Sequence, residues 1–218
     1  MPTIKQILIE ARTTLTGPDA RLEAEVLMEA ICAISRSRQF SHADDQLAAD
    51  QVEKYRCALQ RRIAGEPLAH ITALRGFWDM DLQVTPDVLI PRPDTEILVE
   101  QALERIPRDA SWQIADLGTV SGAIAIAVAR ERSQCDLTAT DNSPAALAIA
   151  KENTIELGVI NINFIAGSWG QSLKNRCFDM IISNPPYIRG DDPHLTEGDL
   201  PAEPEQALIS GSDGLDAI

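Results

Sequence analysis

The sequence predicts an α/β protein in which a small helical bundle and a β-hairpin precede a parallel sheet. Apolar residues of the first 65 positions recur at helical spacing, the stretch from 70 to 92 breaks into short β-like pieces, and from 113 onward strand-like and helix-like segments alternate. A chain of 218 residues with 44% hydrophobic content can bury one large core or two small ones. We therefore expect a helical domain over 1–68, a hairpin linker over 69–92 and an α/β domain over 93–218.

The N-terminal part carries three apolar stripes at intervals of three and four residues. They predict helices over about 4–15, 20–34 and 50–64, with stripe residues such as Ile7, Leu27 and Leu59. None of these short helices can bury its stripe alone, so together they predict a bundle.

The stretch "HITALRGFWDMDLQVTPDVLIPR" has aromatic Phe77 and Trp78 and prolines at its turns, which predicts a hairpin. A helix follows, because Pro93, Asp94 and Glu96 suit the first turn of a helix.

The remainder predicts a parallel sheet. Strand candidates begin near 113, 136, 162 and 178, with helices over 121–132 and 143–158 between the first three, and a last helix begins at "DGLDAI". Strand–helix–strand repeats give right-handed crossovers, and such sheets bind ligands at the carboxyl ends of their strands.

Charge and cysteine usage narrow the function classes. A formal charge of −14 disfavours nucleic acid as a direct partner, while eight acidic residues between 191 and 216 form either a solvated segment or a rim that attracts a basic macromolecule. The four cysteines lie far apart without a CxxC pair, and no apolar run is long enough to span a membrane. We expect a cytoplasmic monomer with reduced cysteines, no metal and no membrane segment.

Two features at the expected carboxyl ends indicate a nucleotide-type cofactor. The loop Gly118-Thr119-Val120-Ser121-Gly122 opens a helix, and Asp141 ends the next strand, where its carboxylate can accept bonds from both hydroxyls of a ribose. NAD enzymes and S-adenosylmethionine enzymes share this arrangement. The loop lacks the GxGxxG order of dinucleotide binders, which disfavours the first class.

The tetrapeptide Asn184-Pro185-Pro186-Tyr187 after the fourth strand decides between the NAD enzymes and the S-adenosylmethionine enzymes. Methylation of a planar nitrogen requires acceptors that hold its NH₂ group. Asn184 offers a side-chain oxygen and Pro185 a backbone carbonyl, the two prolines fix their directions, and Tyr187 offers a stacking face. The motif therefore predicts an amide or amine clamp.

The chain resembles class I S-adenosylmethionine-dependent methyltransferases of the HemK/PrmC type, the protein-(glutamine-N5) methyltransferases of peptide chain release factors. The resemblance lies in "GEPLAHITALRGFW", "LIPRPDTEILVEQAL", "DLGTVSGAIAIA", "TDNSPAALAIAKEN", "GSW" and "FDMIISNPPYI". It implies a Rossmann-like catalytic domain whose sheet is incomplete at the C-terminus, and a helical domain that docks class 1 release factors. The methylated group is then the glutamine amide of a Gly-Gly-Gln loop.

Carried over by resemblance, the loop Gly118, Thr119, Val120, Ser121 and Gly122 borders the methionine part of S-adenosylmethionine. Asp141 holds the ribose, and Trp169 lies beside the adenine or else serves the core. Asn184 contacts the cofactor and, with Pro185, Pro186 and Tyr187, holds the glutamine; Asn184, Pro185 and Tyr187 are the expected catalytic residues. Phe77, Arg92 and Glu96 are further candidates to approach the site.

Two departures from the family keep other functions open. Val120 stands where the family has glycine, and only the first four strands of the family's sheet are present. The alternatives are a nucleic-acid adenine-N6 methyltransferase and a release-factor-binding protein with impaired catalysis.

Overall fold

The computed structural model describes all 218 residues. The chain divides into two compact units, Met1–Thr72 and Ala73–Ile218. None of its helices is both long and apolar enough to cross a membrane.

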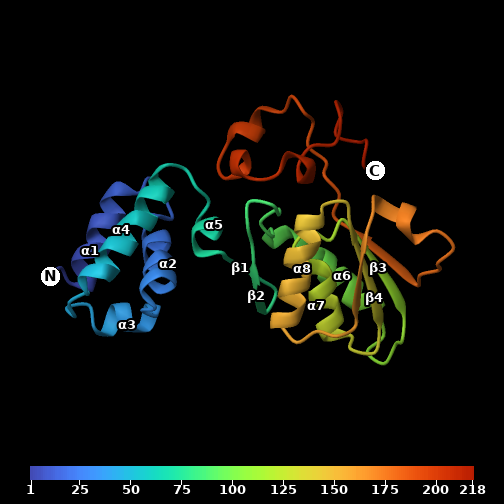
Figure 1. Cartoon of the computed structure of the whole chain (residues 1–218), viewed down its shortest axis with the longest axis horizontal. Helices are drawn as coiled ribbons and strands as arrows, with labels where there is room; N and C mark the ends of the chain where they lie inside the picture. Colours follow the sequence, from blue (N-terminus) through green and yellow to red (C-terminus); the bar gives the residue numbers. More distant parts are fainter. The chain divides into compact units, whose positions relative to one another are not determined.

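The first unit is the expected helical bundle. Tyr55 and Leu27 are fully buried at its centre, and the Tyr55 hydroxyl donates to the carbonyl of Ala24 at 3.0 Å. The three main helices pack alongside one another (Figure 1), as their apolar stripes predict. The helices are α1 (Ile4–Thr14), α2 (Ala20–Cys32), α3 (Arg36–Ser41), α4 (Ala49–Ile63) and α5 (Leu68–Thr72).

The hairpin consists of β1 (Leu74–Phe77) and β2 (Met80–Gln83), which pair antiparallel with Phe77 opposite Met80. The expected start at residue 69 is too early, because residues 68–72 form the short helix α5. The hairpin belongs to the second compact unit. Phe77 and Leu82 point into the core of that unit, so burial of alternate residues explains why the strands form there.

The sheet of the second unit is parallel throughout, with the order β5-β4-β3-β6. The four predicted strands are therefore confirmed, and β3 lies between β4 and β6. Helices α6, α7 and α8 pack on one face (Figure 1), and α7 is buried from Ala123 to Ala129. The elements are η1 (Pro93–Thr95), α6 (Glu96–Arg105), β3 (Gln113–Leu117), α7 (Ala123–Glu131), β4 (Asp136–Asp141), α8 (Pro144–Glu156), β5 (Ile162–Ala166), η2 (Trp169–Leu173) and β6 (Met180–Ser183).

Beyond β6 the chain contains only short 3-10 turns, η3 (Pro193–Thr196), η4 (Leu200–Ala202) and η5 (Glu205–Ala207). The helix expected from Asp213 is wrong, since residues 213–218 form turns. Gly214 in this stretch has a positive φ of 84°, and Gly211 just before it has a φ of 69°. Within this segment, Ile188 and Ile209 form an isolated parallel bridge.

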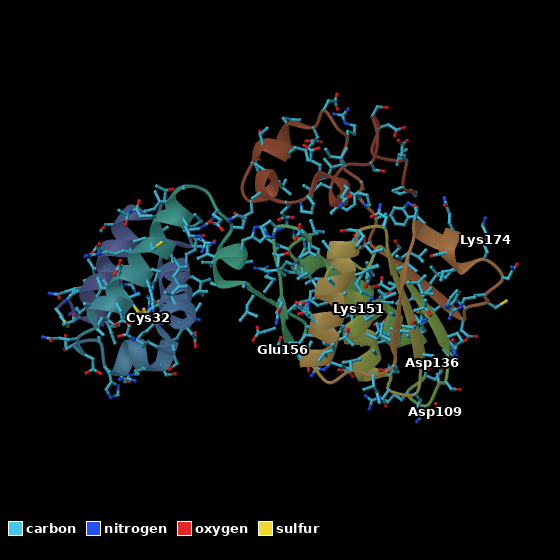
Figure 2. All side chains as sticks on the ribbon, viewed as in Figure 1. Cys32, Asp109, Asp136, Lys151, Glu156 and Lys174 are labelled. Atoms are coloured by element: carbon cyan, nitrogen blue, oxygen red, sulfur yellow. The ribbon has the colours of Figure 1, made fainter.

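The buried amide of Asn153 in α8 fixes the hairpin to this unit. Its Oδ1 accepts from the backbone N–H of Gln83 at 2.7 Å, and its Nδ2 donates to the carbonyls of Gln83 and Ser121 at 3.1 and 2.9 Å. At the end of the same helix, where Figure 2 labels Glu156, Gln83 Nε2 donates to Glu156 Oε2 at 2.6 Å. One helix thus holds both the hairpin and the loop that follows β3.

Candidate functional site

The carboxyl ends of β3, β4 and β6 meet at a cavity of about 630 Å³. Six of the residues singled out from the sequence line it together, namely Gly118, Val120, Asp141, Trp169, Asn184 and Pro186. They come from three strand ends and from η2, over 69 positions of the chain. The parallel topology therefore produces the expected convergence.

Most backbone N–H groups of the loop 118–122 already donate hydrogen bonds to other groups of the protein. Gly118 and Thr119 both donate to the carbonyl of Thr140 at 2.9 Å, and Gly122 donates to the carbonyl of Thr119 at 2.8 Å. The N–H of Val120 donates to Asp141 Oδ2 at 2.9 Å. The loop thus presents a surface shaped by these bonds, rather than a row of free amides, to the cavity.

Val120 adopts the left-handed conformation, with φ of 53°. Its neighbours Gly118 and Gly122 have φ of 74° and 85°, which glycine adopts without steric cost. For a β-branched residue this region is a genuine outlier, at about 1–2 kcal/mol for any L-residue. The bond from Val120 to Asp141 helps to hold this strained geometry in place.

Asp141 and Trp169 both line the first cavity. Asp141 is 8% exposed, and its Oδ1 accepts from the backbone N–H of Ser143 at 2.9 Å. Each of its oxygens therefore retains a lone pair for a further donor. A Cβ at Gly118 would lie 3.5 Å from the Trp169 ring, so the absence of a side chain keeps this side of the ring free.

Asp116, at the end of β3, lies directly beneath the loop. Its Oδ2 accepts a hydrogen bond from Thr119 Oγ1 at 2.6 Å. Complete burial raises the pKa of Asp116 to about 6, and the bond from Thr119 only partly opposes this effect. The loop thus rests on a carboxyl group that titrates close to neutral pH.

Asn184 lies where three cavities meet. Besides the first cavity, it lines one of about 940 Å³ with Pro185 and Tyr187, and one of about 380 Å³ with Thr119 and Ser121. Its Nδ2 donates to Thr95 Oγ1 at 3.2 Å. This bond directs the amide nitrogen toward η1 and leaves Oδ1 available as an acceptor.

Three of the remaining candidates, Gly122, Phe77 and Glu96, have structural roles. Gly122 lies outside these three cavities, and a Cβ there would approach Ile126 Cδ1 at 2.9 Å, so this glycine serves the packing of α7. Phe77 is a core residue at 2% exposure. Glu96 accepts from the backbone N–H of Trp78 at 2.9 Å and fixes the hairpin turn.

Arg92 does line the second and third cavities. Its Nη2 lies 2.6 Å from Oε1 of Glu203, whose side chain is fully buried. Burial raises the pKa of Glu203, against the opposing effect of Arg92. The pair fastens the segment around Glu203, whose neighbours Pro204 and Ala207 line the first cavity.

Sequence reasoning missed Thr95, Asn153 and Glu203. Thr95 belongs to the "IPRPDTE" motif, which supplied a signal, but nothing local relates it to a residue 89 positions away. Asn153 and Glu203 act through partners 70 and 111 positions distant.

The residues of the first cavity fit a nucleoside-containing cofactor. A carboxylate with free lone pairs suits ribose hydroxyls, and an aromatic ring suits a purine. Asn184 lines this cavity together with both groups, and it also lines the second cavity.

Two family models match the chain. One, described as PrmC N-terminal domain, matches residues 6–72, and the other, described as methyltransferase small domain, matches residues 93–207. Among solved structures, the S-adenosylmethionine-dependent methyltransferase from Agrobacterium tumefaciens superposes with a TM-score of 0.46 and 18% identity, covering 53% of this chain and 40% of that one.

Curated relatives named release factor glutamine methyltransferase are similar over nearly the whole chain. The Xylella fastidiosa (strain 9a5c) protein is 47% identical over 94% of this chain and 75% of its own length. The Coxiella burnetii protein is 46% identical over 96% and 75%, and the Escherichia coli (strain K12) protein 44% identical over 95% and 75%. The chain thus belongs to the release factor glutamine methyltransferase family, a family of S-adenosylmethionine-dependent enzymes.

Proposed function

We propose that this protein transfers a methyl group from S-adenosylmethionine to the side-chain amide nitrogen of the glutamine in the Gly-Gly-Gln motif of class 1 release factors. The observation that carries the proposal is the position of Asn184, which lines both the cavity of Asp141 and Trp169 and the cavity of Tyr187. A methyl donor in the first and an acceptor in the second would meet at this side chain.

In the proposed complex, Gly118, Thr119, Val120 and Ser121 border the methionine part of the cofactor. Asp141 accepts from the ribose, and Trp169 lies against the adenine. When bound, the cofactor supplies an electrophilic sulfonium methyl group. Gly122 shapes the loop through its packing against α7 rather than by contact.

The chain's own groups orient the acceptor. Asn184 Oδ1 and the carbonyl of Pro185 accept from the glutamine NH₂, and Thr95 keeps the carboxamide of Asn184 in that orientation. Pro186 stiffens the turn, and Tyr187, whose side chain is 66% exposed, is free to stack on the incoming peptide.

An amide nitrogen is a poor nucleophile, so positioning carries much of the acceleration. Alignment of two reactants contributes roughly 7–11 kcal/mol. Transfer of the methyl group, with S-adenosylhomocysteine as the leaving thioether, would place positive charge on the accepting nitrogen, and the acceptors at Asn184 and Pro185 would stabilise that charge more strongly than the ground state. The extra proton then leaves to water or a neighbouring acceptor.

The test is transfer of label from S-adenosylmethionine to purified release factor, with DNA as the competing substrate. We expect label on the factor alone, and none on a factor whose motif glutamine is replaced. Asn184→Ala should lower kcat by about 100-fold or more while cofactor affinity changes little. Label on DNA would instead support an adenine methyltransferase, and equal losses in kcat and cofactor affinity would remove the assigned role of Asn184.

One observation favours a second candidate, a release-factor-binding protein with impaired transfer. Val120 occupies the cofactor-side cavity in a strained conformation. Binding of release factor without any transfer of label would support this candidate. In either case we propose that the protein acts as a monomer in the cytoplasm; its four free cysteines support the reducing compartment.

A further inference from the structure

The first unit contains a cavity whose charges do not balance. Three guanidinium groups, those of Arg12, Arg21 and Arg36, converge on the carboxylate of Glu25 at 2.9, 2.8 and 3.0 Å. The carboxyl side chain is only 10% exposed, while those of Arg21 and Arg36 are 73% and 57% exposed. One carboxylate thus faces three cations, and a surplus of two positive charges remains.

This arrangement differs from the other ion pairs of the unit. Arg38, Lys54, Arg56 and Arg61 each pair with a carboxylate of their own. The surplus is also unusual for a chain with a formal charge of −14. The other unit carries most of this negative charge, since residues 1–72 hold nine of the 19 basic side chains and ten of the 33 acidic ones.

The cavity has a volume of about 640 Å³, and Leu8 and Phe40 provide its apolar part. Phe40 is 87% exposed, which is unusual for a large aromatic side chain without a partner. An occupant that covers it would gain from apolar burial as well as from charge.

Two buried polar atoms indicate what the occupant must offer. Gln39 lines the cavity at 5% exposure, and its Nε2 donates to the carbonyls of Glu25 and Ile34, whereas its Oε1 has no partner. The buried Nε of Arg12 also lacks an acceptor. The site therefore requires both an acceptor and a donor.

We propose that this cavity, lined by Arg12, Arg21, Arg36, Gln39 and Phe40, binds an acidic, partly apolar segment on the surface of the protein substrate. A carboxylate side chain supplies the acceptor for the arginines, a peptide N–H supplies the donor for Gln39, and an apolar neighbour covers Phe40. A nucleic-acid phosphate fits less well, because it carries no donor and the other unit repels a polyanion. The identity of the partner as a release factor rests on the proposed function.

The test compares two double variants of the full chain. Arg21→Gln/Arg36→Gln removes two charges from the cavity, and Lys5→Gln/Lys54→Gln removes two exposed charges elsewhere in the same unit. Affinity for purified release factor is measured by calorimetry at low and high salt, together with the melting temperature and the affinity for S-adenosylmethionine. We expect about tenfold weaker factor binding for the first variant only, with a reduced salt dependence and unchanged cofactor affinity.

This readout separates the two proposals, because binding is measured without catalysis. Weaker binding of the factor by a chain that transfers no label would support the docking site and remove the proposed activity. Equal affinities of both variants would overturn the docking site while leaving the activity intact. Selective loss of binding to a labelled RNA oligonucleotide, with factor binding unchanged, would likewise overturn it and assign the cavity to nucleic acid.

Discussion

Replacement of Val120 separates the two consequences of a β-branched residue in the cofactor loop. The residue has φ of 53° and lines the first cavity. Its backbone strain is present whether or not the cofactor is bound, so the strain lowers the stability of the fold and cancels from the binding equilibrium. Its isopropyl group occupies space at the cavity wall, so it affects the binding equilibrium directly.

The two contributions have different magnitudes in the variants Val120→Gly and Val120→Ala. Glycine removes about 1–2 kcal/mol of strain but costs about 0.5–1 kcal/mol through the greater freedom of the unfolded chain. The net gain in the free energy of unfolding is therefore about 1 kcal/mol. Alanine keeps the Cβ and most of the strain, and it removes the two methyl groups. Relief of overpacking is worth about 1–3 kcal/mol, so both variants should bind S-adenosylmethionine about 5- to 150-fold more tightly.

Calorimetric titration of S-adenosylmethionine measures the affinities, and urea unfolding without cofactor measures the stabilities. We expect Val120→Ala to share the affinity gain of Val120→Gly but not its gain in stability. Equal cofactor affinities of the parent and both variants would refute the steric reasoning. Equal stabilities of the two variants would refute the assignment of strain.

Three further predictions concern the groups that hold the site. Thr95→Val should lower kcat about tenfold with unchanged cofactor affinity, because Asn184 loses its orienting acceptor; steady-state kinetics would contradict this if kcat stayed at the parent value. Asp116 has a pKa of about 6 in the folded state. Above about pH 4 the unfolded state has released this proton while the folded state still holds it. The free energy of unfolding therefore declines as the pH rises from about 4 to about 6. Asp116→Asn should therefore unfold like the parent at pH 4 and be more stable at pH 7 by up to about 3 kcal/mol in urea titrations, and a constant difference across this range would count against the pKa. Arg92→Gln should destabilise by about 3 kcal/mol because it strands the buried carboxylate of Glu203, and Arg92→Gln/Glu203→Gln should recover most of the loss; unfolding curves without recovery would show that the two side chains act independently.

The sequence predicts those features that have a local period or a fixed place in the topology. The four strands and helices α7 and α8 lie within a few residues of their expected ranges, because alternation and apolar runs signal them directly. Helix α3 was missed, since it is six residues long and buries only Gln39. The helix expected from Asp213 does not form, because Gly214, its second residue, adopts the left-handed conformation.

In the candidate site, too, only features with a local signal or a fixed place in the topology could be predicted. The convergence of Gly118, Asp141 and Asn184 could be predicted because parallel strands bring their carboxyl ends to one edge. The bond from Thr95 to Asn184 and the Arg92–Glu203 pair join residues 89 and 111 positions apart, and neither leaves a trace in local spacing. The packing role of Gly122 could not be predicted either, because the sequence does not show whether a glycine in such a loop makes room for a ligand or for the following helix.

Asn184 lines three cavities, so the proposed binding of methyl donor and acceptor on either side of it would be thermodynamically linked. A ligand that immobilises this side chain from one cavity spares the second ligand that entropic cost, so the second binds more tightly. Reciprocity requires that each ligand raise the affinity of the other by the same factor. In the proposed complex, the single side chain of Asn184 would thereby give positive cooperativity between cofactor and substrate.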